Sequence, residues 1–143
     1  MSREIRRVAV ANWLMLLAML IFFAACSKPA KPSFRVFASA DEAGTALLDA
    51  AKSVDQNALL AIFGTDAKDL ISSGDAVQDK AAVDRFVAAY PVMHRWRNMA
   101  DGDQVLLVGA DNFPFPIPLK KNASGQWFFD TAAGKDEILS LRR

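Results

Sequence analysis

Apolar residues are concentrated in one run near the start of the chain. From Val8 to Ala25 every residue is apolar except Asn12, and three arginines precede the run. Arginine stays on the cytoplasmic side of a membrane while an apolar run of this kind enters the bilayer. The pattern therefore predicts a membrane-targeting segment that includes an apolar signal helix, and this segment needs an explanation separate from the fold.

The only cysteine, Cys26, stands directly after Ala24 and Ala25. This arrangement resembles the lipobox of bacterial lipoproteins, although Phe23 occupies the position that usually carries leucine. The resemblance implies cleavage before Cys26, lipidation of its thiol and anchoring in the cell envelope. Because Ser27 follows, it implies the outer membrane where there are two. An uncleaved transmembrane helix and an ordinary cleaved signal remain as alternatives, and all three place the remaining chain in the periplasm or outside the cell.

The chain divides into three segments on this basis. Residues 1–26 form the signal, and residues 27–36, which are rich in proline and lysine, form a solvated spacer. Residues 37–143 are predicted to form a single domain. A chain of this length can bury roughly two thirds of its surface in one hydrophobic core.

The first half of the predicted domain has the pattern of helices. Ser39 and Glu42 fit a capping box, and the apolar residues after them recur on one side of a helix. Asp55 is expected to cap a second, short helix that ends at Gly64. We expect further helical segments over residues 67–71, 76–90, 94–99 and 132–141.

The second half has the pattern of strands. Residues 105–108 form a short apolar stretch, and residues 126–130 follow the turn at 122–125. Between them, prolines alternate along residues 113–119, so one edge of that strand lacks N–H donors and is expected at a sheet edge or an opening. Several N-terminal helices packed on a small curved antiparallel sheet give an α+β domain, similar to cystatin-like or nuclear-transport-factor-like folds.

Several segments together resemble one bacterial protein family. They are SSGDAVQD at 72–79, RFVAAY at 85–90, VGADNFPFPIPL at 108–119 and WFFDTAAGKDEIL at 127–139. The chain is similar to the domain-of-unknown-function 2950 family of exported proteins, and this resemblance implies no particular activity. It does imply a second, glycine-rich half beyond residue 143, so the chain is either a naturally short member or a truncated reading frame.

Charge and the scarcity of histidine exclude some function classes. Of the 17 basic and 16 acidic residues, three and one respectively lie in residues 1–26, which leaves 14 basic and 15 acidic residues. A balanced charge is not typical of nucleic-acid binding, so no nucleic acid is expected. His94 is the only histidine, and Asp101 and Asp103 lack the further ligands of a calcium loop. We therefore expect no metal and no cofactor.

Six residues are candidate binding positions, and none is assigned as catalytic. They are Asp75, His94, Trp96, Phe115, Trp127 and Asp130. Each has a structural alternative, because an aspartate can cap a helix and an aromatic side chain can fill the core. The anchor, the aromatic residues and the lack of a catalytic set favour a non-enzymatic envelope lipoprotein that binds an envelope protein or a small apolar ligand.

Two other hypotheses remain open for this chain. A hydrolase-type enzyme of the envelope would use Asp75, His94 or Asp130 as acid or base, which requires these side chains to meet in one cleft. The other hypothesis is an inert remnant of a longer family member.

Overall fold

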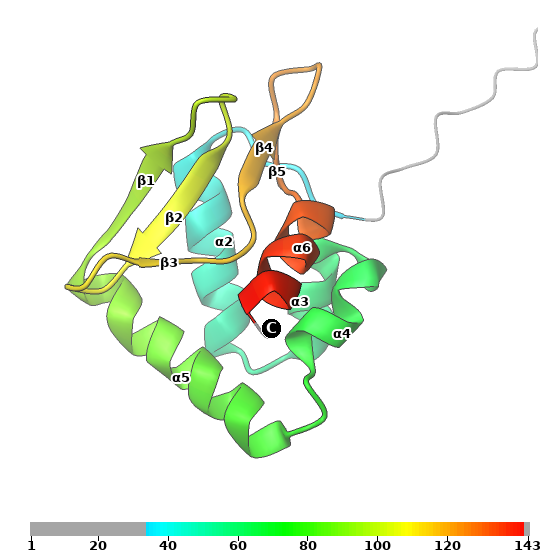
Figure 1. The fold of residues 1–143 in the computed structure, drawn as a ribbon, viewed down its shortest axis with the longest axis vertical. Helices are drawn as coiled ribbons and strands as arrows, with labels where there is room; N and C mark the ends of the chain where they lie inside the picture. Colours follow the sequence, from blue (N-terminus) through cyan, green and yellow to red (C-terminus); the bar gives the residue numbers. More distant parts are fainter. Residues whose placement is uncertain (1–33, 142–143) are drawn as a thin grey trace, which may run out of the picture. The chain divides into compact units, whose positions relative to one another are not determined.

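The computed structural model describes residues 34–141, so the predicted signal and Cys26 lie outside the described residues. The helices are α2 (Ala40–Lys52), α3 (Gln56–Phe63), the 3-10 turn η1 (Thr65–Ala67), α4 (Lys68–Ile71), α5 (Ala76–Val92) and α6 (Thr131–Leu141) (Figure 1). The strands are β1 (His94–Asn98), β2 (Gln104–Val108), β3 (Phe113–Pro114), β4 (Leu119–Lys121) and β5 (Trp127–Phe129). Helices with one antiparallel sheet confirm the predicted α+β class. No helix in this part of the chain is long and apolar enough to cross a bilayer.

Polar residues cap the helices where their sequence predicts it. At the start of α2, Ser39 Oγ accepts the N–H of Glu42 at 3.1 Å, and the Glu42 carboxylate accepts the N–H of Ala38 at 3.2 Å. Asp55 caps α3 in the same way, accepting a backbone N–H at 2.9 Å. Gly64 follows α3 with φ 88° and ψ 162°, a conformation that glycine alone adopts readily. The bonds to Ser39 and Asp55 satisfy N–H groups that a helix leaves free at its first turn.

Strand β2 is the strand that joins the sheet together. It pairs along its length with β1 on one side, and on the other side with β3 and then β4. Strand β5 completes the sheet beside β4, in the order β1-β2-β4-β5. All of these pairs are antiparallel. Strand β1 therefore forms one edge of the sheet.

The proline-rich segment is divided between β3 and β4, where its sequence predicts a single strand. Phe115, between the two, donates its backbone N–H to the carbonyl of Leu106 in β2 at 2.8 Å. Pro114 and Pro116 have no N–H to donate, and among the described strands β3 pairs with β2 alone. The part of the segment around β3 thus lies at a sheet edge, as its missing donors predict.

The prediction of a helical turn at residues 94–99 is wrong. Residues 94–98 form strand β1, in register with β2 from His94 opposite Val108 to Asn98 opposite Gln104. A short segment with two arginines carries little strand signal of its own, and pairing with a neighbouring strand decides its conformation. The helical prediction failed because the strand that pairs with residues 94–98 is β2, which lies further along the chain at residues 104–108.

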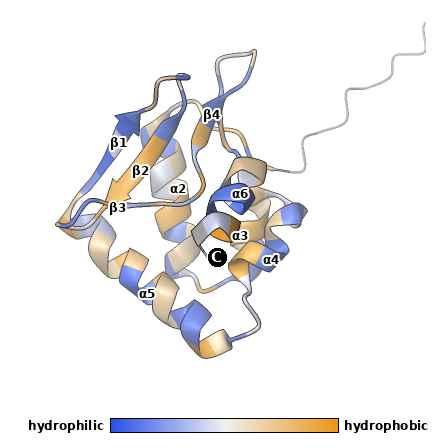
Figure 2. Ribbon diagram, in the orientation of Figure 1, coloured by the Kyte–Doolittle hydropathy of each residue, from blue (hydrophilic) through white to orange (hydrophobic). Residues whose placement is uncertain are grey.

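The inner face of the sheet packs against helices α2 and α3. Leu106 of β2 and Leu119 of β4 are 0% exposed, and Phe129 of β5 is 1% exposed. Ala43 and Leu47 of α2 belong to the same cluster of buried side chains. Figure 2 shows β2 as the most hydrophobic strand, with β1 more hydrophilic beside it. Because burying one leucine stabilises a fold by about 1.5–3 kcal/mol, this cluster holds the sheet on the helices.

The segment just before α2 packs onto the domain, although its sequence pattern assigns residues 27–36 to a spacer. Arg35 donates its backbone N–H to the carbonyl of Ala61 in α3 at 3.0 Å. Phe37 is buried and exchanges two backbone hydrogen bonds with Trp127 of β5, at 2.7 and 2.8 Å. Arg35, in the described part of the predicted spacer, is therefore tied to α3, and Phe37, the first residue of the predicted domain, is tied to the sheet.

Helices α2 and α5 contact one another closely at Gly44. A Cβ atom at this position would lie 2.6 Å from Tyr90 Oη and 3.5 Å from Trp96 Cζ2. The first distance is too short for a carbon atom, whereas the second is an ordinary contact. Glycine inside a helix is about 1 kcal/mol less favourable than alanine, so the close approach of Tyr90 explains why a glycine is needed here.

We predict that Gly44→Ala lowers the free energy of unfolding by about 1–2 kcal/mol, because overpacking outweighs the gain in helix propensity. In a Tyr90→Phe background the blocking hydroxyl is absent, and the same substitution should raise stability by up to about 1 kcal/mol. Chemical unfolding followed by tryptophan fluorescence measures both changes. An equal effect of Gly44→Ala in the two backgrounds would contradict this account of the contact.

Candidate functional site

The two candidate aspartates cap helices. The Asp75 carboxylate accepts the N–H groups of Val77 and Gln78, both at 3.0 Å, at the start of α5. The Asp130 carboxylate accepts the N–H of Ala133 at 3.2 Å at the start of α6. Each carboxylate thus has a local partner in the first turn of a helix, where negative charge is favoured.

His94 lies at the opposite end of α5 from Asp75. Its Nδ1 donates to the backbone carbonyl of Tyr90 at 3.0 Å, and the two rings stack with centroids 4.0 Å apart. Since α5 has 17 residues and a helix rises 1.5 Å per residue, its ends lie about 25 Å apart. The structure therefore does not bring Asp75 and His94 into one acid–base site.

The three aromatic candidates pack against the buried cluster. Trp96, Phe115 and Trp127 are half-buried, and each contacts the core. The ring of Phe115 lies 6.1 Å from that of Phe63 and 5.7 Å from that of Phe86. These contacts place the aromatic side chains among the core residues of the sheet and helices, which leaves the inner face of the sheet filled by the protein's own side chains.

Tyr90, which stacks on the candidate His94, is a titratable group with a shifted pKa. It is the only tyrosine in the chain and is 5% exposed. Burial raises the pKa of its phenol, and the carboxylates of Asp41 and Asp49 on α2 raise that pKa further. The phenol is therefore neutral throughout the physiological pH range, and its role at Gly44 is one of packing.

The acidic pair between β1 and β2 forms a turn. Asp101 accepts the N–H of Asp103 at 3.0 Å. Burial raises the pKa of the Asp103 carboxyl, and the neighbouring carboxylate of Asp101 adds to this shift. Among residues 34–141, no group of three or more histidine, cysteine, aspartate or glutamate side chains is arranged to hold a metal ion.

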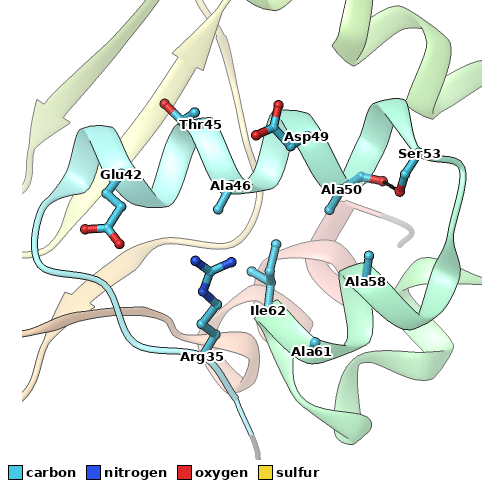
Figure 3. A pocket seen from close by; sticks show the side chains of 10 residues that line it. All are labelled: Arg35, Glu42, Thr45, Ala46, Asp49, Ala50, Ser53, Ala58, Ala61 and Ile62. Carbon is cyan, nitrogen blue, oxygen red and sulfur yellow. Dashed lines mark hydrogen bonds between the residues drawn. The ribbon is translucent and has the colours of Figure 1, made fainter.

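A hollow open to solvent lies between α2, α3 and the segment before α2 (Figure 3). Its volume is about 700 Å³. The lining residues are Arg35, Glu42, Thr45, Ala46, Asp49, Ala50, Ser53, Ala58, Ala61 and Ile62. Small side chains from both helices leave this space free, so the hollow has an apolar floor with charged groups around it.

Among residues 34–141, Arg35 is the only cation that lines this α2–α3 hollow. Figure 3 shows its side chain reaching toward α2, with Glu42 extending into the same space. In that view Thr45 and Asp49 leave α2 on the side turned away from Arg35. The Arg35 guanidinium lies 4.9 Å from the ring centre of Phe37, a distance at which a cation and an aromatic ring attract one another. An aliphatic floor between a guanidinium and a carboxylate can hold a small molecule of opposite charges by weak contacts.

Comparison with known proteins places the chain in a family. The model of the family described as "Protein of unknown function (DUF2950)" matches residues 34–143. The chain belongs to this DUF2950 family. No curated protein and no solved structure matches the chain. The resemblance seen in the sequence is thereby confirmed, and the family description assigns no activity that could be carried to these residues.

The sequence pattern of this DUF2950 protein did not indicate the hollow. Arg35 falls in the predicted spacer, and the hollow forms only where α2 and α3 meet. One signal was present in the sequence: Ala46 and Ala50, four residues apart, lie on one side of a helix. Such a pair does not reveal whether a second helix covers it or leaves it open.

We predict that the phenol of Tyr90 in the folded DUF2950 protein ionises above its ordinary pKa of about 10. A raised pKa in the folded state gives stability that is complete below about pH 10 and is lost as pH rises through the folded-state value. Phenolate absorbance in the near ultraviolet reports this residue alone, because the chain has one tyrosine. Stability should fall less steeply at high pH in Tyr90→Phe. A midpoint equal to that of the urea-unfolded chain would contradict the assignment.

Proposed function

We propose that this DUF2950 protein is a non-enzymatic binding module of the cell envelope, anchored by lipid on Cys26, and that the α2–α3 hollow is its ligand site. The observation that carries the ligand site is the guanidinium of Arg35. Among the described residues the one ion pair is between Lys80 and Asp84, so Arg35 reaches into the hollow without an acidic partner within 4.0 Å. An unpaired guanidinium beside an apolar floor favours a ligand with a carboxylate.

The lining residues define the chemistry of that ligand. A guanidinium binds a carboxylate through two parallel hydrogen bonds. Glu42 faces the same space and favours an ammonium group, and it disfavours a ligand with several negative charges. The floor of alanine and isoleucine side chains suits a short aliphatic group. The proposed ligand class is therefore a small zwitterion with an aliphatic side chain, such as an aliphatic amino acid or the end of a peptide.

An acid–base enzyme has less support than a binding module. Asp75 and Asp130 accept hydrogen bonds from their own helices, and His94 lies at the far end of α5 from Asp75. A small ligand under the sheet also has less support, because Leu106 and Leu119 are fully buried there. The hollow is on the helical side of the domain and is open to solvent.

We predict that leucine binds in the hollow with a dissociation constant on the order of millimolar, because exposed ion pairs contribute little. The probes are leucine, 4-methylpentanoate and isopentylamine, which differ only in the ammonium and the carboxylate. Leucine should bind most tightly in a ligand-detected NMR titration. Arg35→Ala should weaken the binding of leucine by about tenfold and leave the binding of isopentylamine unchanged.

Arg85→Ala is the matched control for this titration, since Arg85 is exposed on α5 and does not line the hollow. It should bind all three probes as the native chain does. Equal binding of leucine by the native chain and Arg35→Ala would refute the ligand site and would leave the envelope anchor untested by this titration.

We predict that cells expressing the chain attach a clickable fatty acid to it, and that Cys26→Ala abolishes this label because no other thiol is present. Ser27→Ala is the control and should keep the label. Mass spectrometry of the mature chain should find Cys26 as its first residue. An unlabelled chain that retains residues 1–25 would favour the uncleaved anchor and overturn the lipid attachment.

A further inference from the structure

Within the part of the chain that the structure describes, strand β1 leaves one of its two edges open. It is the first strand in the order β1-β2-β4-β5, and β2 is its partner on the inner side. In Figure 1, no strand of the described chain lies beyond β1. An open edge presents backbone donors and acceptors on which another extended chain can add a strand.

The register shows which backbone groups point outward. Gly109 donates to the carbonyl of Met93 at 2.8 Å, and Met99 donates to the carbonyl of Asp103 at 2.8 Å. In an antiparallel pair such bonds recur at every second residue. Odd-numbered residues of β1 therefore bond to β2, and the N–H and C=O groups of His94, Trp96 and Asn98 face the open edge. Within residues 34–141, these three N–H groups have no hydrogen-bond partner in the structure.

The side chains of β1 divide by the same alternation. Trp96 packs toward the core, close to Gly44 of α2. Arg95 and Arg97 consequently share the opposite face of the sheet, and both are exposed. Neither arginine takes part in an ion pair with a residue of the described chain. The hydrophilic colour of β1 in Figure 2 agrees with its sequence, in which His94 and Asn98 accompany the two arginines.

We infer that β1 binds an extended segment of another protein that carries acidic residues at every second position. Backbone hydrogen bonds along the open edge would hold the segment, and carboxylates opposite Arg95 and Arg97 would select it. Opposite charges on directly facing strands stabilise the pair, and like charges destabilise it. This inference concerns a surface separate from the α2–α3 hollow and does not depend on the ligand proposed there.

Charge argues against two other occupants of the edge. Antiparallel pairing of β1 with β1 of a second copy, centred on Trp96, would set Arg95 of each copy opposite Arg97 of the other. The chain's own residues 1–33 contain five basic residues and one acid. They also contain two prolines, which have no backbone N–H to donate. Both occupants would place positive charge beside Arg95 and Arg97, and residues 1–33 would also lack backbone N–H groups at their prolines. The edge instead favours a negatively charged segment with all of its N–H donors.

The geometry makes a specific prediction about the bound strand. Residues of an added antiparallel strand that lie opposite Arg95 and Arg97 form non-hydrogen-bonded pairs, so their N–H groups point away from β1. Residues opposite His94, Trp96 and Asn98 direct their N–H groups toward β1. In a peptide that alternates valine and glutamate, the valine N–H groups should therefore bond to β1 and the glutamate N–H groups should not.

The test uses the full-length chain, isotopically labelled, in micelles of an uncharged detergent. A capped peptide of alternating valine and glutamate should bind and shift the amide signals of residues 94–98. Methylation of the valine nitrogens should weaken binding by about tenfold or more, because several hydrogen bonds are lost. Methylation of the glutamate nitrogens should leave binding within about twofold of the unmodified peptide.

Charge reversal tests the selection of acids. The variant Arg95→Glu/Arg97→Glu should no longer bind the glutamate peptide. It should instead bind the same peptide with lysine in place of glutamate. Lys52→Glu/Arg85→Glu makes the same change in net charge at exposed positions of α2 and α5, and should keep the native preference. The unchanged amide spectrum of the remaining domain confirms that each variant is folded.

Three results would overturn the inference. The first is no binding of the glutamate peptide to the native chain. The second is equal weakening by the two sets of methylated peptides, which would indicate attraction by charge without strand addition. The third is binding that shifts signals elsewhere and leaves those of residues 94–98 in place.

Discussion

The packing of the Phe129 ring against four other aromatic rings is the interaction on which the arrangement of this domain depends. The Phe129 ring lies 5.2 Å from the ring of Phe63, 6.1 Å from that of Phe115, 6.2 Å from that of Phe37 and 6.5 Å from that of Trp96. These four side chains come from α3, the proline-rich segment, the segment before α2, and β1. Buried aromatic pairs contribute both area and a preferred geometry. One side chain of β5 therefore links four parts of the chain that are distant in sequence.

A filled core leaves binding to the outer surfaces of the domain. Helix α2 shows how one element serves both purposes, because Ala43 and Leu47 are buried in the core, Ala46 lines the α2–α3 hollow, and Ala50 belongs to both. The core side of the helix and the side that lines the hollow are therefore adjacent, and they meet at Ala50. Strand β1 divides its side chains in the same manner, with a period of two, between the core and solvent. The α2–α3 hollow thus lies at the margin of the core, where Ala50 and Ile62 belong to both, and the open edge of β1 lies outside the core.

Much of the local structure could be predicted because its causes are local. Ser39, Asp55 and Asp75 accept N–H groups within two or three residues of themselves, so each helix start is encoded in a short stretch of sequence. Alternating prolines remove donors from one edge wherever their strand is placed. The family could also be recognised from short motifs, which the match over residues 34–143 confirms. The lipid anchor stays a prediction that depends on the sequence around Cys26.

The sequence by itself determined the α+β class, the helix starts and the alternation of faces, because each follows from interactions between near neighbours. Only the tertiary structure decided that residues 94–98 are a strand, since their hydrogen bonds go to β2. The same holds for the aromatic candidates, whose burial depends on which distant rings they meet. Arg35 could be proposed as a binding residue only from the tertiary structure, in which it lines the hollow between α2 and α3. Contacts between segments far apart in the chain leave no periodic trace in either segment, so pattern alone could not reveal them.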